Sequence, residues 1–467
     1  MASPWIVTLL CGFLGATLIQ ANLQPPAVLN LGPEVIKNRL TQALEDHDAT
    51  AILQELPLLR AMQDKSGRIP ILDNLLRTVL RYIVWMKVTS ANILQLVVEP
   101  STYDQELVVR IPLDMVAGLN TPLIKTIVEF QMHTEVQALI RVERSKSGPT
   151  RLNLSDCSSN ESTLRLSLLR KLSFVVNSLA KNVMDLLVPA LPQIVKTHVS
   201  KTRPLGYEDG TPSPIALSPG ALEFDLLSPA IQDSNILFNL KAELLDSQAR
   251  VTNWFNSSVA SPVETTPDGA PFSLTVRQDL VNAVVTTLVP KEELVILLRF
   301  VIPDVARQLQ MDIKEINEEA ANKLGPTQML KIFTHSTPHI MLNEGGATAA
   351  QSVVLEVFPT NADVRPFFSL GIEASYEAQF FTEGNRLMLN FNNVSIERIK
   401  LMISDIKLFD PEVLKDTLTK ILEYTLLPNE NGKLRTGVPM SMSKAFGYEK
   451  ALWSVSKGVL KLTPASS

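Results

Sequence analysis

Cysteine is scarce in this chain, which has only two among 467 residues. Cys11 lies in the N-terminal apolar segment, so Cys157 is expected to stand alone in the mature protein. A single cysteine excludes a thiolate-rich metal site. In an oxidising compartment a lone cysteine is a free thiol, half of an intermolecular bridge or a residue that has lost its partner, unless it is simply a small buried side chain. The sequence slightly favours the last interpretation.

The chain also lacks the motifs of common catalytic sites. No Gly-X-Ser-X-Gly segment supplies a lipase-type nucleophile, and no glycine-rich loop is suited to a phosphate group. His335 and His339 have the spacing of a helical metal site, but Pro338 between them disfavours a helix. We therefore expect no enzyme activity, no metal and no cofactor.

Neither sign of charge dominates, and no internal apolar run reaches the roughly 18 residues of a membrane span. The chain has 43 Lys and Arg against 48 Asp and Glu, a net charge of −5. It therefore lacks the basic stripe of a nucleic-acid-binding protein. Hydrophobic residues nevertheless make up 45% of the chain, and the mean hydropathy is +0.13. This apolar surplus must be packed inside the domains or offered to a ligand.

The N-terminus is typical of a secretory signal. Residues 6–19 are apolar and uncharged, and cleavage is expected between Ala21 and Asn22. A membrane anchor is the alternative, disfavoured because the segment is short. Secretion agrees with four Asn-X-Ser sequons, at Asn153, Asn160, Asn256 and Asn393. We expect a secreted, extracellular glycoprotein.

In residues 128–143 the even positions are apolar except Thr134 and the odd positions are polar except Leu139, which predicts a long strand with one apolar face. At about 3.3 Å per residue, such a strand is far longer than usual and suits a large, curved antiparallel sheet. Residues 368–380 repeat the alternation, and a turn at 383–385 leads into a second strand. The apolar faces of these strands must be shielded from water, either by other side chains of the protein or by a bound lipid.

An amphipathic helix is expected after each strand region, over about 163–188 and about 411–427. Both halves therefore share one plan, a long curled sheet plus a helix, which indicates a duplicated domain. Further helices are expected at about 33–59, 278–288, 291–302 and 304–324. Because 467 residues are too many for one core, two domains are expected. The predicted parts are a signal peptide (1–21), an N-terminal domain (22–199), a linker with central-sheet strands (200–245), a C-terminal domain (246–440) and a tail (441–467).

Six segments spread over the chain resemble one family. They are 32–36 (GPEVI), 92–96 (NILQL), 111–116 (IPLDMV), 154–157 (LSDC), 371–374 (GIEA) and 431–439 (NGKLRTGVP). The family is that of bactericidal/permeability-increasing protein (BPI), lipopolysaccharide-binding protein and the PLUNC proteins, and the chain resembles its long PLUNC branch. The resemblance implies an α+β fold. Two BPI-like domains, each a long twisted antiparallel sheet or barrel with amphipathic helices, form a boomerang joined by a central sheet.

The resemblance also implies an apolar lipid pocket in each domain. Members of the family bind phospholipid or lipopolysaccharide and act in innate immunity at mucosal surfaces, including the airway. The apolar faces described above supply the candidate lining residues, namely Val128, Phe130, Met132, Val136, Ile140, Leu168, Leu172, Val176, Phe368, Leu370, Ile372, Leu418 and Leu422.

One departure from the family pattern concerns Cys157. In the family the matching cysteine pairs with another in the helix that follows, but the corresponding position near Val199 has none. Residues 198–211 do not resemble family sequence. An alternative transcript or an error in the gene model would explain this difference. The mildly acidic net charge also differs from the strongly basic members, so direct membrane lysis is not expected.

The leading hypothesis is a secreted lipid-binding protein of mucosal innate defence that sequesters bacterial amphiphiles or modulates the response to them. Its partners would be phospholipid or lipopolysaccharide, with peripheral contact to a membrane or bacterial surface and no nucleic acid. The alternative is a surface-active or adhesive structural glycoprotein of mucus without a stoichiometric lipid. The sequence leaves the oligomeric state and the lipid open.

Overall fold

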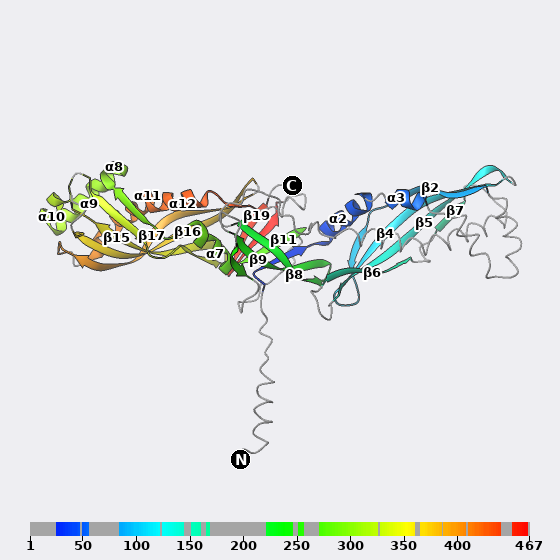
Figure 1. Cartoon of the computed structure of the whole chain (residues 1–467), viewed down its shortest axis with the longest axis horizontal. Helices are drawn as coiled ribbons and strands as arrows, with labels where there is room; N and C mark the ends of the chain where they lie inside the picture. The colour runs from blue at the N-terminus through cyan, green and yellow to red at the C-terminus, as the bar shows by residue number, and fades with distance from the viewer. Residues whose placement is uncertain are drawn as a thin grey trace, which may run out of the picture. The chain divides into compact units, whose positions relative to one another are not determined.

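The structure, a computed structural model, describes most of the chain in two compact units (Figure 1). The N-terminal unit comprises Asn30–Thr211 and Leu227–Phe238, and the C-terminal unit comprises Met1–Leu29, Pro212–Leu226 and Asn239–Ser467. The predicted domain boundaries and boomerang arrangement stay predictions. The described residues are 25–46, 49–55, 84–121, 124–143, 151–159, 165–168, 221–245, 251–255, 270–325, 327–359, 365–384, 386–407, 410–439 and 451–465.

The N-terminal unit is built on an antiparallel sheet whose two longest strands are β4 (Glu106–Thr121) and β5 (Ile124–Glu143). They pair over nearly their whole length, from Glu106 opposite Arg141 to Thr121 opposite Ile124. The predicted long strand over 128–143 is therefore confirmed. The other strands of this sheet are β2 (Trp85–Ile93), β3 (Val97–Pro100), β6 (Arg151–Ser159) and β7 (Arg165–Leu168).

The helix predicted from residue 163 is wrong where the structure describes it. Residues 165–168 form β7, which pairs antiparallel with β5 from Phe130 opposite Leu168 to His133 opposite Arg165. The four residues Arg-Leu-Ser-Leu alternate with period two, and the long β5 offers them a free backbone, so strand pairing prevails over the helical spacing. The rest of the predicted helix lies outside the described residues.

Two helices, α2 (Pro33–Asp46) and α3 (Ala49–Gln54), precede this sheet and confirm the first predicted helical segment as far as it is described. Pro33 occupies the first helical turn, where its missing N–H costs nothing. Val35, Ile36, Leu40 and Leu44 recur at helical spacing and are all buried.

A second sheet contains the hairpin of β8 (Ala221–Gln232) and β9 (Asn235–Leu245), within the segment 200–245 for which strands were predicted. Among the strands that the sequence analysis missed are β1 (Ala27–Leu31) and β11 (Phe272–Arg277), in which every residue is buried. The almost unbroken apolar sequence of β1 gives no period of two, whereas β11 does alternate between apolar and polar residues but is only six residues long. The remaining strands are β10 (Val251–Phe255), β19 (Ala451–Ser456) and β20 (Val459–Pro464).

The C-terminal unit is centred on β15 (Gly346–Val357), β16 (Phe368–Glu383) and β17 (Arg386–Ser404). The β16–β17 hairpin has the predicted turn, and its register is shifted by bulges near Ser369, Glu373 and Ser375. Such bulges bend and twist long strands. The sheet order is β12-β13-β15-β16-β17-β18, with β14 on β15, and the outer strands are β12 (Glu293–Leu297), β13 (Met329–Thr334), β14 (His339–Asn343) and β18 (Val438–Pro439).

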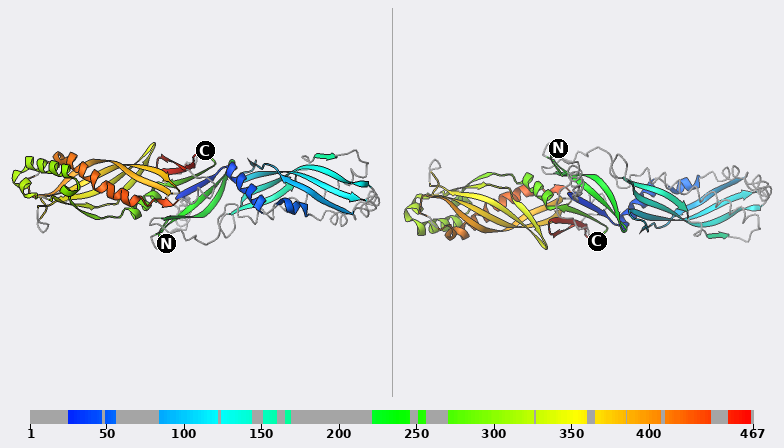
Figure 2. Two further views of the ribbon diagram at one scale, coloured as in Figure 1. Left: turned by 90° about the horizontal axis from the view of Figure 1, so that it is seen from above. Right: turned by 90° about the horizontal axis from the view of Figure 1, so that it is seen from below.

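Helices cover one side of this sheet. The predicted helix at 411–427 is confirmed as η2 (Pro411–Leu414), α11 (Lys415–Tyr424) and α12 (Leu426–Leu434). Both α11 and α12 pack against β17, and seen from above they lie across the strands (Figure 2). The predictions at 278–288 and 304–324 are also confirmed, as α7 (Gln278–Leu288), α9 (Pro303–Ile316) and α10 (Glu318–Lys323).

The helix predicted over 291–302 is wrong. Residues 293–297 form β12, paired with β13 from Glu293 opposite Phe333 to Leu297 opposite Met329, and only α8 (Leu298–Val301) is helical. An unbroken apolar run such as 294–298 satisfies the period of either element, and the exposed edge of β13 selects the strand.

Candidate functional site

The inner face of the N-terminal sheet is apolar and fully covered. On β4 the odd-numbered side chains from Leu107 to Ala117 are at most 2% exposed. They pair with the predicted face of β5, where Val136 is 0% and Ile140 7% exposed. Register places Val128, Phe130 and Met132 opposite Leu119, Ala117 and Met115, and Leu168 opposite Phe130. The candidates Leu172 and Val176 lie outside the described residues.

The inner face of the C-terminal sheet is equally apolar. The candidates Phe368, Leu370 and Ile372 are buried on β16, and Leu418 and Leu422 are buried on α11. From Leu370 to Glu377 the buried side chains of β16 alternate with exposed or half-exposed ones, because a strand sends successive side chains to opposite faces, whereas Ser369 is buried as well. The structure thus places these five residues in one core between sheet and helices.

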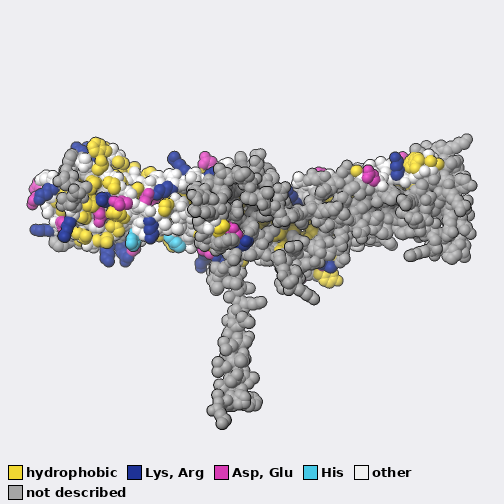
Figure 3. Space-filling model, in the orientation of Figure 1, with side chains coloured by type: hydrophobic (Ala, Val, Ile, Leu, Met, Phe, Trp, Pro, Cys, Tyr) yellow, Lys and Arg dark blue, Asp and Glu magenta, His cyan; other side chains and the backbone are white. Residues whose placement is uncertain are grey.

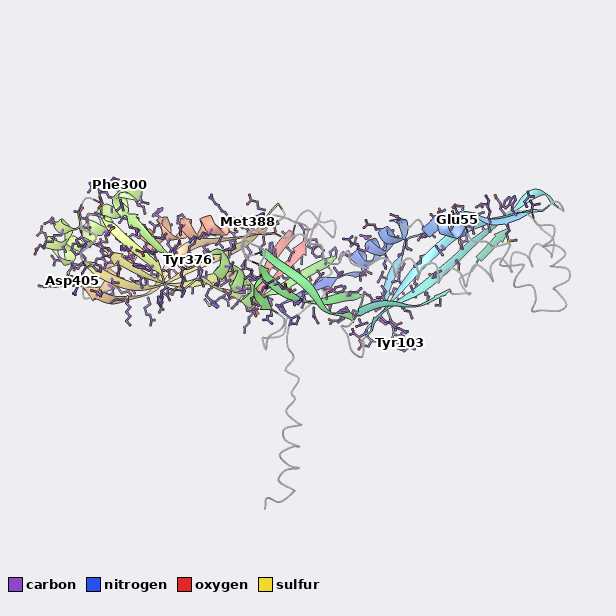
Figure 4. All side chains as sticks on the ribbon, viewed as in Figure 1. Glu55, Tyr103, Phe300, Tyr376, Met388 and Asp405 are labelled. Atoms are coloured by element: carbon purple, nitrogen blue, oxygen red, sulfur yellow. The ribbon has the colours of Figure 1, made fainter. Side chains whose placement is uncertain are left out.

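A polar cluster interrupts this core, and sequence analysis did not find it. The Tyr376 hydroxyl donates to Gln351 Oε1 at 2.9 Å, and Gln351 Nε2 donates to Glu430 Oε1 at 2.7 Å and to the Ser336 carbonyl at 3.1 Å. Glu430 is 0% exposed, and its Oε2 has no hydrogen-bond partner in the described part of the chain. Tyr376, labelled in Figure 4, stacks on Phe391 with 5.6 Å between ring centroids.

The cluster shifts two pKa values. Burial raises the pKa of Glu430 to about 7, against the hydrogen bond from Gln351 and the positive charge of Lys433. Burial, helped by the negative charge of Glu430, raises the pKa of Tyr376 well above its usual value. Near neutral pH the buried carboxyl is therefore partly protonated, and the phenol is neutral.

A network at the start of β12 connects α12 to the sheet. Lys433 forms an ion pair with Glu292 at 2.6 Å, and the Asn429 side-chain amide donates to the same carboxylate. The backbone N–H of Glu292 donates to Thr334 Oγ1 at 2.7 Å. These contacts hold α12 next to the first residue of the edge strand β12.

Two cavities lined by described residues have volumes of about 460 Å³ each. One, in the N-terminal unit, lies between residues 100–106 and the β8–β9 turn, beside Tyr103 (Figure 4). There the side-chain amide of Gln105 exchanges two hydrogen bonds with the backbone of Ile231, at 2.9 and 3.0 Å. Its lining is mostly polar. None of the predicted pocket residues lines either cavity.

The second cavity is an open apolar groove on the C-terminal unit. One wall is β12 and α8, and the other is the junction of α11 and α12 at Tyr424, Thr425 and Asn429. Five of its lining side chains are large, apolar or aromatic, and exposed, namely Val295, Leu297, Phe300, Val301 and Tyr424. The sequence offered no signal for this groove, because residues 291–302 were predicted to form a helix and not an edge strand.

The predicted modification sites are only partly described. Asn393 lies on β17, is exposed, and has a φ of 47° beside a bulge, a conformation that asparagine tolerates. Asn153 and Cys157 lie in β6, which ends at Ser159. Residues 1–24, which include Ala21 and Asn22, lie outside the described part, as do Asn160, Asn256, residues 198–211 and Val199.

The described residues contain no group of three or more His, Cys, Asp or Glu side chains placed to hold a metal ion. Nor do they contain a helix long and apolar enough to cross a membrane.

Comparison with known proteins identifies the family. A model of the N-terminal domain of the LBP / BPI / CETP family matches residues 43–202, and a model of its C-terminal domain matches residues 320–463. The chain is 87% identical to BPI fold-containing family B member 1 of Mus musculus, over 100% of both chains. This chain belongs to the LBP/BPI/CETP family.

Further relatives within the family are more distant. BPI fold-containing family B member 1 of Homo sapiens is 56% identical, over 100% of this chain and 98% of its own length. The crystal structure of lipopolysaccharide binding protein matches 95% of this chain and 99% of its own, with 14% identity and a TM-score of 0.48. The sequence-based family resemblance and the mixed helix-and-sheet, two-domain LBP/BPI architecture are thereby confirmed.

Proposed function

We propose that this protein is a secreted lipid-binding protein whose two domains each hold acyl chains against the apolar face of a long sheet. The observation that carries the proposal is the buried, mainly apolar inner face found in both units of an LBP/BPI/CETP family member, which the cluster of Gln351, Tyr376 and Glu430 interrupts in the C-terminal unit. Each buried methylene contributes about 0.8 kcal/mol, so two long acyl chains would gain on the order of 20 kcal/mol before ordering costs.

The candidate lining residues follow from the geometry of the faces. In the C-terminal unit they are Phe368, Leu370 and Ile372 on β16, with Leu418 and Leu422 on α11. In the N-terminal unit they are Val136 and Ile140, together with positions 128, 130, 132 and 168 of the same paired strands. These positions combine long apolar surface with helices that form a second wall.

We further propose that the ligand is a phospholipid or lipopolysaccharide and that the protein acts in mucosal innate defence, sequestering bacterial amphiphiles or modulating the response to them. Support for this finer role comes from the name of one relative, lipopolysaccharide binding protein, and from the sequons that suit an extracellular glycoprotein. The net charge of −5 favours sequestration over lysis of anionic membranes.

The test is mass spectrometry of an organic extract of the protein purified from a secreting cell line. The proposal predicts phospholipid in roughly stoichiometric amount, exchangeable for added lipopolysaccharide or phospholipid. Protein that carries no lipid and takes up none would overturn it and support the structural role in mucus. Ester hydrolysis that persists through repurification would point to an enzyme instead.

A further inference from the structure

The apolar groove on the C-terminal unit has the features of a surface that binds to a membrane. We propose that its exposed residues, Val295, Leu297, Phe300, Val301 and Tyr424, form a membrane-contact patch that binds the surface of an anionic phospholipid bilayer. This patch lies outside the proposed acyl pockets and does not depend on their being occupied.

Local structure fixes the apolar side chains outward. In the four-residue helix α8, Leu298 is fully buried, whereas Phe300 is 74% and Val301 56% exposed. The buried side chain of Leu298 fixes the orientation of this short helix, and the side chain of Phe300 therefore points into solvent. Figure 4 labels Phe300 at the outer side of α8, and apolar side chains gather over this part of the surface in Figure 3.

The edge strand extends the same surface. On β12 the side chains of Val295 and Leu297 are exposed, while Ile296 between them is buried. Polar or charged side chains normally protect an exposed edge strand, so an apolar one indicates a surface with a partner. Tyr424 adds an aromatic ring with a polar end, a combination that favours the boundary between lipid and water.

The charges around the groove favour an anionic partner. The acids at the start of β12 are neutralised, Glu292 by Lys433 at 2.6 Å and Glu293 by Lys331 at 3.5 Å. Several exposed charges on the surrounding elements take part in no ion pair with a described residue, and these are Lys291, Arg299, Asp416, Lys420 and Glu423. Three of these five charges are positive, a net of +1, and Arg299 is adjacent to Phe300 on α8, where it can pair with lipid phosphate.

A peptide strand fits this edge less well than a lipid surface. An added strand would have to lie alongside β12, where the α11–α12 junction already forms the opposite wall of the groove. Asn429 and Lys433 hold α12 there through Glu292. A bilayer needs only the protruding tips of Phe300, Val301 and Leu297, not the backbone edge.

The experiment is flotation of the full-length protein with vesicles of phosphatidylcholine alone or mixed with phosphatidylglycerol. The wild type is expected to bind the mixed vesicles more tightly, and added salt is expected to weaken this binding. Phe300→Ser should lower the affinity for mixed vesicles about tenfold, since it removes one deeply inserting ring. Val301→Ser should lower it less, and Arg299→Glu should remove the preference for the anionic vesicles.

Tyr103→Ser is the matched control, because Tyr103 is 72% exposed on the N-terminal unit and should leave flotation unchanged. Lipid extracted from Phe300→Ser should equal that of the wild type, which separates this patch from the acyl pockets. A wild type that does not float, or a Phe300→Ser and Val301→Ser pair that float like wild type, would overturn the proposal. The proposal would also be overturned if the wild type bound no vesicles but formed a concentration-dependent dimer that Phe300→Ser abolished.

Discussion

Asn431 on α12 holds the backbone of Phe391 on β17 with both ends of its side-chain amide. The Phe391 N–H donates to Asn431 Oδ1 at 2.8 Å, and Asn431 Nδ2 donates to the Phe391 carbonyl at 2.9 Å. Asn282 on α7 does the same for Ile340 on β14, at 2.6 and 2.9 Å. In each case a side-chain amide takes the place of a neighbouring strand, and this ties a helix to the sheet.

Replacing Asn431 with Leu should therefore loosen α12 from β17. The change leaves a backbone donor and an acceptor without partners, at a cost of about 3 kcal/mol. Chemical denaturation should show the loss, and hydrogen exchange should be accelerated at the Phe391 amide in particular. Asn392→Ala is the control, because Asn392 contacts only side chains and should change stability by less than about 0.5 kcal/mol. Equal effects from the two variants would contradict the role of the clamp.

Glu430 should make the C-terminal unit less stable as the pH rises. Its folded pKa is about 7 and its ordinary value is 4.5, so between these values the folded state binds more protons than the unfolded state. Stability therefore falls across this window, by roughly 3 kcal/mol in total, and this contribution is constant above it. Unfolding measured from pH 4.5 to 8 checks the slope.

Glu430→Gln is the matched variant for that measurement. Glutamine has nearly the same shape, still accepts from Gln351 and carries no charge at any pH. The variant should lose most of the slope and should be more stable than the wild type at pH 8. A variant whose pH profile superimposes on that of the wild type would show that this carboxyl is not the source.

Enlarging a small side chain inside the C-terminal unit should compete with bound lipid. Ala374 is 2% exposed on the inner face of β16, next in the alternation to the candidate Ile372. Ala374→Leu should reduce the amount of extracted lipid and leave the fold intact, because the larger side chain would occupy space that is otherwise filled by lipid. Gln379→Leu, on the exposed face of the same strand, should not change the lipid content. If the interior holds protein side chains alone, Ala374→Leu instead destabilises the unit by about 1–3 kcal/mol through overpacking.

Asn393 should carry a glycan in the secreted protein. Its side chain is exposed, and among the described residues it donates one hydrogen bond, to Glu377 on the neighbouring strand at 2.7 Å, so it is accessible to modification. Enzymatic deglycosylation should lower the mass of the wild type by one glycan more than that of Asn393→Gln. An unmodified tryptic peptide containing Asn393 would contradict this.

The sequence predicted elements whose side chains sort cleanly into two faces. Residues 134–140 and 370–377 alternate between buried side chains and side chains at least partly exposed, so the predicted period of two is seen there, as is the helical spacing of 411–427. It failed where the pattern was short or uniformly apolar. Residues 165–168 and 293–297 suit either element, and the free edge of a neighbouring strand decides.

The site itself was less predictable. The Gln351, Tyr376 and Glu430 cluster joins residues far apart in the chain, and only the packing of α12 beneath β15 and β16 brings them together. The sequence suggests that Val295, Leu297 and Phe300 belong to the core, because the type of an apolar residue does not show whether other residues cover it in the folded protein. Exposure is a property of tertiary structure.

Native mass spectrometry of the secreted protein, before and after delipidation, tests the lipid-binding account most directly. The account predicts a mass excess equal to one or two phospholipid-sized molecules per chain, removed by delipidation and restored by adding phospholipid. A chain that shows only its polypeptide and glycan mass, and remains so after incubation with phospholipid and lipopolysaccharide, would contradict it.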